Sequence, residues 1–280
     1  MREIPVERIT RAVAEMCINC NCLIDPHIKT AFTEAEKRET NPLGRQVLET
    51  LLKNSEVAAD LMIPICQDTG LTVVFVEIGQ EVHLTGGSLE EAINAGVAQG
   101  YTEGYLRKSV VKDPLDRENT GDNTPAVIHY QVVPGDQLKL TVSPKGFGSE
   151  NMSALKMLKP SQGLEGIKRL VLDTVIAGGP NPCPPIIVGV GVGGSMEKAA
   201  LLAKQALLRP VGSPNPDPAW GRIEDDLLTE INQLDIGPAG FGGRATALAV
   251  HINPYATHIA GLPVAVNIGC HFTRHAEIIF

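Results

Sequence analysis

Hydrophobic residues recur at helical spacing over the first sixty positions of the chain. Between Ile4 and Cys17, the apolar residues fall on one side of a helix with 3.6 residues per turn. Asp25-Pro26 and Asn41-Pro42 each combine a capping side chain with a proline in the first turn, which is a typical helix start. The spacing therefore predicts an N-terminal helical layer over about residues 1–60.

After this region the pattern changes to apolar runs rich in β-branched residues, which alternate with helix signals. The strands predicted from these runs cover residues 71–78, 126–133, 137–143, 186–192, 246–252 and 264–268. Pro134-Gly135-Asp136 separates the second run from the third and predicts a hairpin. The capping box Ser88-Leu89-Glu90-Glu91 opens a predicted helix that ends at about Gly104. Further helices are predicted over residues 150–177, 195–208 and 220–234. This order of elements predicts an α+β fold in which a mixed β-sheet carries packed helices.

Composition narrows the class of protein. Hydrophobic residues make up 43% of the 280 positions and charged residues 20%, so the chain can build a globular core. No linker of disordered composition divides it, which predicts a single domain over residues 1–280. The net charge is −8 without a block of like charges, which argues against nucleic-acid binding through a basic face.

No apolar run reaches the ~18 residues that a membrane span needs, so we expect no membrane association. The start of the chain, Met1-Arg2-Glu3-Ile4-Pro5, has no apolar signal segment. We therefore expect a cytoplasmic protein whose cysteines are metal-binding, reactive or buried rather than disulfide-bonded.

The last residues, Glu277-Ile278-Ile279-Phe280, are apolar and need a surface to cover them. Two interpretations are open. The tail packs on its own domain, or it lies at a subunit interface.

Three cysteines stand alone at the ends of apolar runs, among residues that bend the backbone. Cys66 precedes the polar segment Gln67-Asp68-Thr69-Gly70, Cys183 is enclosed by prolines, and Cys270 lies between Gly269 and His271. Proline fixes φ and removes a hydrogen-bond donor, so the loop around Cys183 is predicted to be rigid. Three thiolates that folding brings together would hold an iron–sulfur cluster with one iron open to a substrate. Spacing alone leaves this open against three unrelated loop cysteines.

Two other motifs offer competing chemistry. Cys17-Ile18-Asn19-Cys20-Asn21-Cys22 fits half of a zinc site, but no second ligand pair accompanies it, which favours buried free thiols at a helix end. The run Gly189–Gly194 has the glycine spacing of a dinucleotide-binding turn, but no acidic residue ends a second strand about 20 positions later. Anion binding at the following helix and close packing of strand against helix are the remaining interpretations. A non-catalytic metal- or nucleotide-binding module is therefore the alternative from another functional class.

Further polar motifs accompany the lone cysteines in a fixed order. The order is Ile65-Cys66-Gln67-Asp68-Thr69-Gly70, Asn119-Thr120-Gly121-Asp122-Asn123-Thr124-Pro125, Lys145-Gly146-Phe147-Gly148-Ser149-Glu150-Asn151 and Pro182-Cys183-Pro184-Pro185, then His258 and Cys270. Over nearly the whole chain, this order closely resembles the α subunit, or N-terminal domain, of the class I iron–sulfur fumarate hydratase and L-tartrate dehydratase family. Phe147 departs from the resemblance, since many relatives have a glycine there.

The resemblance implies a [4Fe–4S] cluster held by Cys66, Cys183 and Cys270, with one iron not ligated by protein. That iron would act as a Lewis acid toward a dicarboxylate substrate. The implied reaction is the reversible hydration of fumarate to malate, and the alternative is dehydration of L-tartrate.

The resemblance also implies roles for individual residues. Asp68 and His258 are candidates for proton transfer. Arg107 would pair with a substrate carboxylate through its planar fork of donors. The remaining implied substrate contacts are Gln67, Gly148 and Ser149.

Members of this family take further active-site groups from a second, C-terminal domain. The resemblance therefore implies a separate β subunit and an α₂β₂ assembly for a chain of this length.

Overall fold

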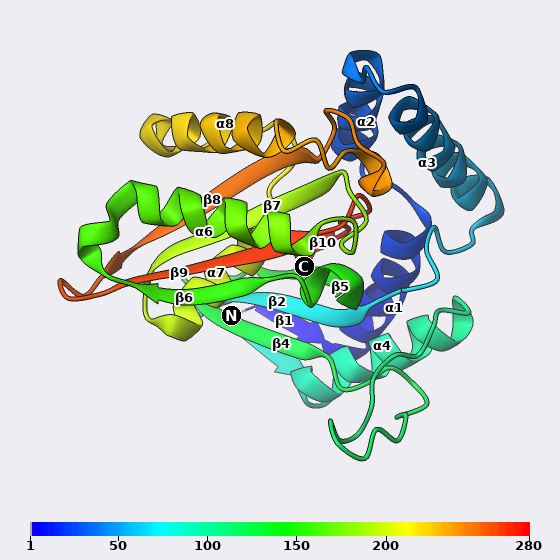
Figure 1. Ribbon diagram of the computed structural model, residues 1–280. Coiled ribbons are helices and arrows are strands. Elements are labelled where there is room, and N and C mark those ends of the chain that lie inside the picture. Colours follow the sequence, from blue (N-terminus) through cyan, green and yellow to red (C-terminus); the bar gives the residue numbers. More distant parts are fainter. Residues whose placement is uncertain (1) are drawn as a thin grey trace. The chain divides into compact units, whose positions relative to one another are not determined.

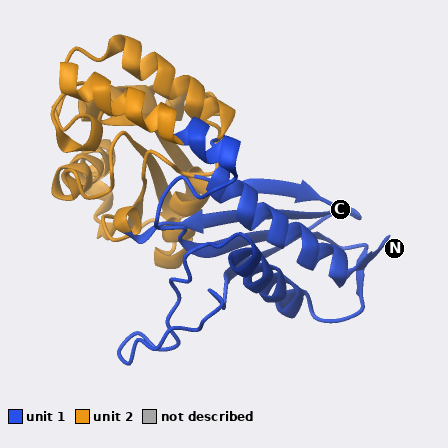
Figure 2. Ribbon diagram, turned by 90° about the vertical axis from the view of Figure 1, so that its right-hand side faces the viewer, with its two compact units in different colours: residues 1–24, 55–147, 274–280 blue, residues 25–54, 148–273 orange. Residues whose placement is uncertain are grey.

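The computed structural model describes residues 2–280, which form two compact units (Figure 2). Unit 1 comprises Met1–Ile24, Ser55–Phe147 and Arg274–Phe280, and unit 2 comprises Asp25–Asn54 and Gly148–Thr273. Helix α3 (Pro42–Leu61) runs across the boundary at residue 54. Helices and mixed sheets in both units confirm the α+β class. The single domain over residues 1–280 stays a prediction.

Unit 1 is built on a four-stranded sheet in the order β10-β5-β2-β4. Strand β2 (Leu71–Gly79) is central, runs parallel to β4 (Val127–Val133) and antiparallel to β5 (Leu138–Lys145). Helices α1 (Val6–Cys22) and α4 (Leu89–Glu103) pack against each other and bury the apolar side of β2 and β5. Their close approach requires Gly96 and Gly100, because a Cβ at either position would collide with the backbone of α1.

The predicted hairpin around Pro134-Gly135-Asp136 is wrong. Strands β4 and β5 follow each other in the sequence, but β2 lies between them and pairs with both. The end of β2 fits against the turn, where Gly79 N donates to Gln137 O (2.8 Å) and Gln80 N donates to Val133 O (2.9 Å). A turn signal fixes a reversal of the chain, whereas long-range pairing decides which strands become neighbours.

The N-terminal helices are confirmed, with a later start for the first. Helix α1 begins at Val6, because Arg2–Pro5 forms strand β1, which pairs in parallel with β3 (Val82–Thr85). Helix α2 (Pro26–Arg38) begins at the predicted cap, where the Asp25 carboxylate accepts from His27 N (2.7 Å) and Ile28 N (3.3 Å).

The C-terminal tail packs on its own unit. Ala276–Ile279 forms strand β10, antiparallel to β5, and Phe280 is 5% exposed. The Arg8 guanidinium lies 5.6 Å from the centre of the Phe280 ring. This confirms the first of the two interpretations, so the apolar tail carries no argument for a subunit interface.

Unit 2 is built on a second four-stranded sheet in the order β6-β9-β7-β8, visible in Figure 1. Strand β7 (Ile186–Gly194) runs parallel to β8 (Ala247–Thr257) and antiparallel to β9 (Leu262–Gly269). Helices α6 (Gly163–Gly178) and α8 (Pro218–Asn232) share the core on one face of this sheet, and α7 (Met196–Ala206) packs on the other. None of the helices in residues 2–280 combines the length and the apolar composition that a membrane crossing requires.

The helix predicted over residues 150–177 is only partly present. The segment contains the last residue of α5 (Phe147–Glu150), strand β6 (Ala154–Leu158), the short helix η1 (Pro160–Gln162) and α6. Strand β6 forms because β9 offers a free edge with which it pairs antiparallel. Pairing with a distant strand overrode the local helical pattern.

The glycine run Gly189–Gly194 serves close packing of helix on strand. A Cβ at Gly189 or Gly191 would collide with backbone oxygens of α7, so only glycine lets this helix lie directly on β7. At the start of α7, the Ser195 hydroxyl donates to the Glu197 carboxylate (2.5 Å). The glycine spacing therefore has a structural explanation.

A buried carboxylate ties the N-terminal part of unit 2 to the rest of that unit. Glu39 is 1% exposed and follows α2. Its Oε1 accepts from Thr40 N (2.8 Å) and Asn41 N (2.9 Å), and its Oε2 accepts from Arg244 N and Ala245 N (both 2.9 Å). Four backbone donors thus satisfy the buried carboxylate, which costs much free energy when it is left without hydrogen bonds.

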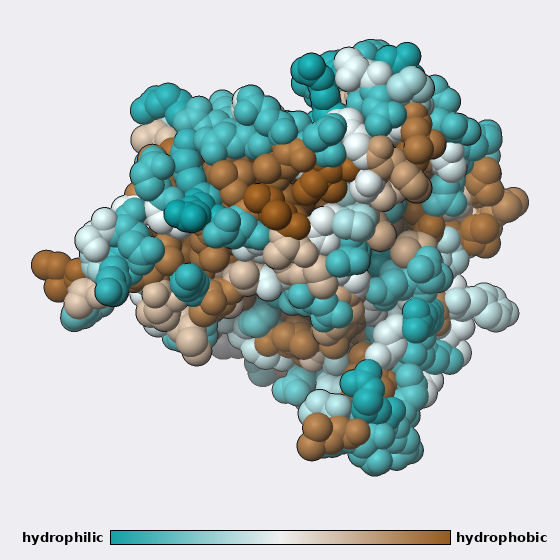
Figure 3. Space-filling view, viewed as in Figure 1, coloured by the Kyte–Doolittle hydropathy of each residue, from teal (hydrophilic) through white to brown (hydrophobic). Residues whose placement is uncertain are grey.

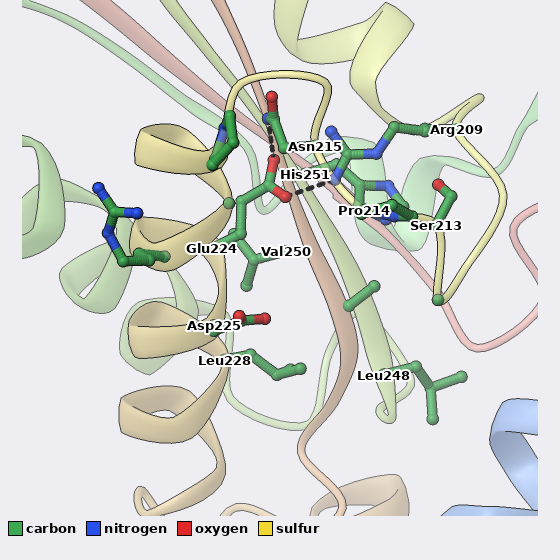
Figure 4. A pocket seen from close by; sticks show the side chains of 15 residues that line it. Arg209, Ser213, Pro214, Asn215, Glu224, Asp225, Leu228, Leu248, Val250 and His251 are labelled. Carbon is green, nitrogen blue, oxygen red and sulfur yellow. Dashed lines mark hydrogen bonds and ion pairs between the residues drawn. The ribbon is translucent and has the colours of Figure 1, made fainter.

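A cavity of about 510 Å³ lies between β8, the start of α8 and the loop that precedes α8 (Figure 4). Glu224 organises its wall, since its carboxylate accepts from Arg209 Nη2 (2.6 Å), Asn215 Nδ2 (2.7 Å) and Ile252 N (2.6 Å). His251 lines the same cavity and is 2% exposed. Because Ala206 O can only accept, His251 Nδ1 (3.1 Å away) carries the proton and donates to it.

We predict that His251 makes unit 2 sensitive to acid. Burial, followed by the charge of Arg209, lowers the pKa of His251 to about 4, below its ordinary 6.5. A lowered histidine pKa means that the folded state binds fewer protons, so stability is complete above pH 6.5 and falls as the pH decreases toward 4. Between pH 7.5 and 5, the free energy of unfolding should fall by about 2 kcal/mol more in the wild type than in His251→Gln.

Urea titrations of both proteins at the two pH values measure this difference. Equal losses in the wild type and in His251→Gln would contradict the assignment.

Candidate active site

The loop that contains Cys66 is held in place within unit 1 by hydrogen bonds from the side chains of Tyr101 and Asn123. Tyr101, which is fully buried on α4, donates its hydroxyl to Thr69 O (2.6 Å) and lies 2.9 Å from Gly70 O. Asn123 Nδ2 also donates to Gly70 O (3.2 Å). The loop carbonyls therefore have fixed partners, and the residues between Cys66 and Gly70 have a defined orientation.

Asp68 is aimed at the turn Lys145-Gly146-Phe147. Its Oδ1 accepts from Gly70 N (3.0 Å) and its Oδ2 accepts from Phe147 N (2.9 Å). A Cβ at Gly146 would lie 3.2 Å from Oδ2, tighter than ordinary contact, so glycine leaves room for the carboxylate. Two motifs that are 79 residues apart are thereby joined by one side chain.

Gln67 and Arg107 lie beside the same loop. Gln67 is exposed, and its Oε1 is 3.4 Å from Cys66 Sγ. Arg107 is exposed as well, and its backbone oxygen accepts from Thr69 Oγ1 (3.0 Å). The Asn123 side chain fixes the next turn by accepting from Ser109 N (2.6 Å). Four of the predicted features, namely Cys66, Gln67, Asp68 and Arg107, thus belong to one loop cluster of unit 1.

Cys183 and Cys270 are brought together at one end of the central strands of the unit 2 sheet, where β7 begins and β9 ends. The carbonyl of Cys183 accepts from His271 N (3.2 Å) and lies 3.0 Å from His271 Nδ1. The pairing of Ile187 with Gly269 places the start of β7 beside the end of β9, which brings the two loops side by side. Cys183 is exposed and has φ +56°, a left-handed conformation that non-glycine residues rarely adopt.

Gly148 lies at the same end of the unit 2 sheet as the loop that leads to Cys183. A Cβ at this position would lie 3.6 Å from Asn181 O, in the loop that leads to Cys183. Ser149 is buried (3% exposed), and Glu150 beside it accepts from Lys204 Nζ (2.6 Å) and Asn267 Nδ2 (2.8 Å). Through Glu150, the glycine-rich turn is therefore bound to α7 and to β9. The contact on β9, Asn267, is close in sequence to Cys270.

His258 lies at the opposite end of the strands of this sheet, where β7 and β8 end. Strand β8 runs parallel to β7, so its end is far from the start of β7, by on the order of 25 Å for eight residues of extended chain. The interval between His258 and Cys270 contains the whole of β9. His258 occupies the exposed loop between β8 and β9, and the adjacent Ile259 is 91% exposed. This loop projects at the left of Figure 1, and the same projection is partly hydrophobic in Figure 3. Within unit 2, His258 is therefore not grouped with Cys183 and Cys270.

The six cysteines fall into two classes. Cys17, Cys20 and Cys22 are buried in α1, and burial raises the pKa of each of these thiols. Such thiols are poor nucleophiles and poor metal ligands, which confirms the interpretation of buried free thiols. Cys66 and Cys270 are half-buried and Cys183 is exposed, so these three thiols are accessible.

No group of three or more His, Cys, Asp or Glu side chains that could hold a metal ion occurs among residues 2–280. The iron–sulfur cluster therefore stays a prediction, and the accessible thiols are the donors of this chain that suit it.

His271 and Tyr101 are among the residues that hold these loops and were not identified from the sequence. His271 binds the Cys183 carbonyl, and Tyr101 binds the loop after Cys66. The position of His271 directly after Cys270 was a usable signal. Tyr101 lies on a regular amphipathic helix, and no local pattern reveals a bond that spans 32 residues.

Comparison with known proteins agrees with this arrangement of motifs. The family model described as fumarate hydratase (Fumerase) matches residues 10–279. A Methanocaldococcus jannaschii protein, named as a candidate L(+)-tartrate dehydratase subunit alpha, is 40% identical over 96% of this chain and 96% of its own length. The L(+)-tartrate dehydratase subunit alpha of Escherichia coli strain UTI89 is 33% identical, and that of strain K12 is 32% identical, each over 98% of this chain and 93% of its own length. The chain therefore belongs to the fumarate hydratase (Fumerase) family and is a hydro-lyase.

Proposed function

We propose that this chain is the α subunit of a two-subunit L-tartrate dehydratase. The observation that carries the proposal is the similarity over nearly the full length to chains of that name. Two groups of loop residues support it separately, one around Cys66 in unit 1 and one around Cys183 and Cys270 in unit 2. Each group contains exposed or half-buried polar residues that suit a small dicarboxylate.

Fumarate hydratase is the second candidate, favoured by the description of the family model. Both reactions are the reversible loss of water from a 2-hydroxy dicarboxylate, which is malate in one case and L-tartrate in the other. Their substrates differ by one hydroxyl group, and no residue of this chain described above separates them. We place tartrate first because the similar chains carry that name.

The proposal includes a [4Fe–4S] cluster bound by Cys66, Cys183 and Cys270. These are the accessible thiols of the described chain, whereas the other three are buried. When bound, the cluster would supply a Lewis-acidic iron that stabilises the leaving hydroxyl group. The prolines around Cys183 and the bonds from His271 to its carbonyl pre-organise one of the ligand loops.

Asp68 is the proposed proton-transfer group of this chain. A carboxylate offers about four acceptor sites, and two are occupied by Gly70 N and Phe147 N. The others remain for a substrate hydroxyl, so the side chain is oriented and still able to accept a proton. His258 stays the second candidate for this role, and within one chain it lies at the opposite end of the sheet from Cys183 and Cys270.

Substrate binding is assigned to the remaining groups of the two clusters. The exposed Arg107 guanidinium would form two parallel hydrogen bonds with one substrate carboxylate. Gln67 would contact the substrate beside Cys66. The backbone N–H of Gly148 or Ser149 would hold the other carboxylate, as the start of a short turn allows.

A separate β subunit completes the proposed enzyme. The similar chains are named as alpha subunits, which supports a partner of another sequence. Such a partner would supply the substrate contacts that this chain lacks. An α₂β₂ assembly in the cytoplasm is the proposed form.

The test of function is anaerobic co-expression with the proposed β subunit. The purified complex is assayed for dehydration of L-tartrate to oxaloacetate and for interconversion of malate and fumarate. We expect kcat/KM for L-tartrate to exceed that for malate by at least about tenfold, which corresponds to ~1.4 kcal/mol of transition-state discrimination. Preference for malate would select the second candidate, and inactivity on both would refute the proposal.

The test of the cluster uses thiol labelling and metal content. Without iron, the folded chain should be alkylated at Cys66, Cys183 and Cys270, while the other three cysteines react only after unfolding. Reconstitution with iron and sulfide should protect the first three. Cys183→Ser should lose the iron and the activity, whereas the matched variant Cys22→Ala should keep both. Retention of iron and of full activity by Cys183→Ser would remove Cys183 from the ligand set.

A further inference from the structure

Arg274 is a buried cation beneath the Asp68 loop of unit 1, and the proposed reaction gives it no role. It is 5% exposed and lies just before the start of β10 at Ala276. Its Nη2 donates to Asp68 O (2.5 Å), and its own backbone oxygen accepts from Ser143 Oγ on β5 (3.1 Å). The arginine is thus fixed at its backbone by β5 and reaches the loop with its side chain.

The surroundings of the guanidinium define its position further. A Cβ at Gly146 would lie 3.9 Å from Arg274 Nη2 and 3.2 Å from Asp68 Oδ2. Burial raises the pKa of Cys20 and of Tyr101, and the positive charge of Arg274 opposes this rise at both groups. The cation therefore lies among Cys20, Tyr101, Gly146 and Asp68, on the inner side of the loop.

A cation at this depth needs a reason, because its desolvation costs several kcal/mol before hydrogen bonds offset it. A hydrophobic residue would fill the same space at lower cost. What arginine adds is a planar group with several fixed donors, which can hold a carbonyl in one direction. The carbonyl that it holds belongs to the residue whose carboxylate we assign to proton transfer.

We propose that Arg274 is a positioning residue that fixes the backbone of Asp68 and thereby aims the Asp68 carboxylate at Gly70 N and Phe147 N. Its catalytic consequence rests on the proposed function, whereas its structural consequence does not. Arg274 also follows Cys270 by four residues, so a short piece of backbone connects one proposed ligand to the residue that holds the Asp68 loop.

The first arm of the experiment measures this orientation without any activity. Amide hydrogen exchange at Gly70 and Phe147 reports on the two bonds that Asp68 accepts. In the full chain, Arg274→Lys and Arg274→Met should exchange these two amides about tenfold faster, as expected when one charge-assisted hydrogen bond is lost. Arg209→Met is the matched control, since Arg209 is also largely buried but binds Glu224 in unit 2.

Acceleration confined to the Arg274 variants supports the proposal. Unchanged exchange at Gly70 and Phe147 in Arg274→Lys, or equal acceleration in Arg209→Met, overturns it. The lysine variant keeps the charge and serves if Arg274→Met does not fold.

The second arm uses the complex with the β subunit, loaded with iron and sulfide. Arg274→Lys should keep its iron content and change KM by less than about threefold, while kcat per cluster falls about 10- to 100-fold, the usual effect of a misplaced group. A purely structural arginine would instead lower the melting temperature and the iron content with kcat per cluster unchanged, which overturns the proposal. Should the wild-type complex act on neither substrate, the proposed function fails, and the exchange arm alone decides the role of Arg274.

Discussion

Hydrogen bonds from buried side chains to loop backbone are the interactions on which the arrangement of this protein depends. Loops that leave a sheet lose the partners that strands supply, and their buried N–H and C=O groups must be satisfied in another way. In unit 1, Tyr101, Asn123 and Arg274 bind the backbone between Asp68 and Gly70. In unit 2, the Glu39 carboxylate accepts four backbone N–H groups. These side chains allow the loops to be irregular and rigid at once, which a functional site requires.

The direction of each strand then decides which loop residues meet. Because β9 runs antiparallel to β7, the end of one strand lies beside the start of the other, and Cys270 is near Cys183. Because β8 runs parallel to β7, the loop after β8 lies at the other edge, and His258 is carried away from both cysteines. The same topology places the cavity around Glu224 on the outer side of β8, where it contains none of the proposed site residues.

Burial separates the cysteines by chemistry. The three on α1 are enclosed by the core of unit 1, where loss of solvation keeps a thiol protonated. The three in loops remain accessible, and accessible thiols can be deprotonated by a metal. A motif that looked suitable for zinc in the sequence thus became part of a core, and three isolated positions became the proposed ligands of a cluster.

The sequence by itself determined the elements whose signals are local. The caps at Asp25 and Ser88, the apolar stripe of α1 and the β-branched runs of β2, β7 and β9 predicted where their elements begin to within about two residues, whereas α1 continues beyond its predicted stripe to Cys22. It also determined the family, since the order of the motifs around Cys66, Asn123, Gly148 and Cys183 extends over the whole chain. Only the tertiary structure decided the insertion of β2 between β4 and β5, the strand at Ala154–Leu158, and the positions of His258 and Arg274. Each of these depends on a partner far away in the sequence, and no local pattern encodes which of several possible partners gives the best-packed sheet.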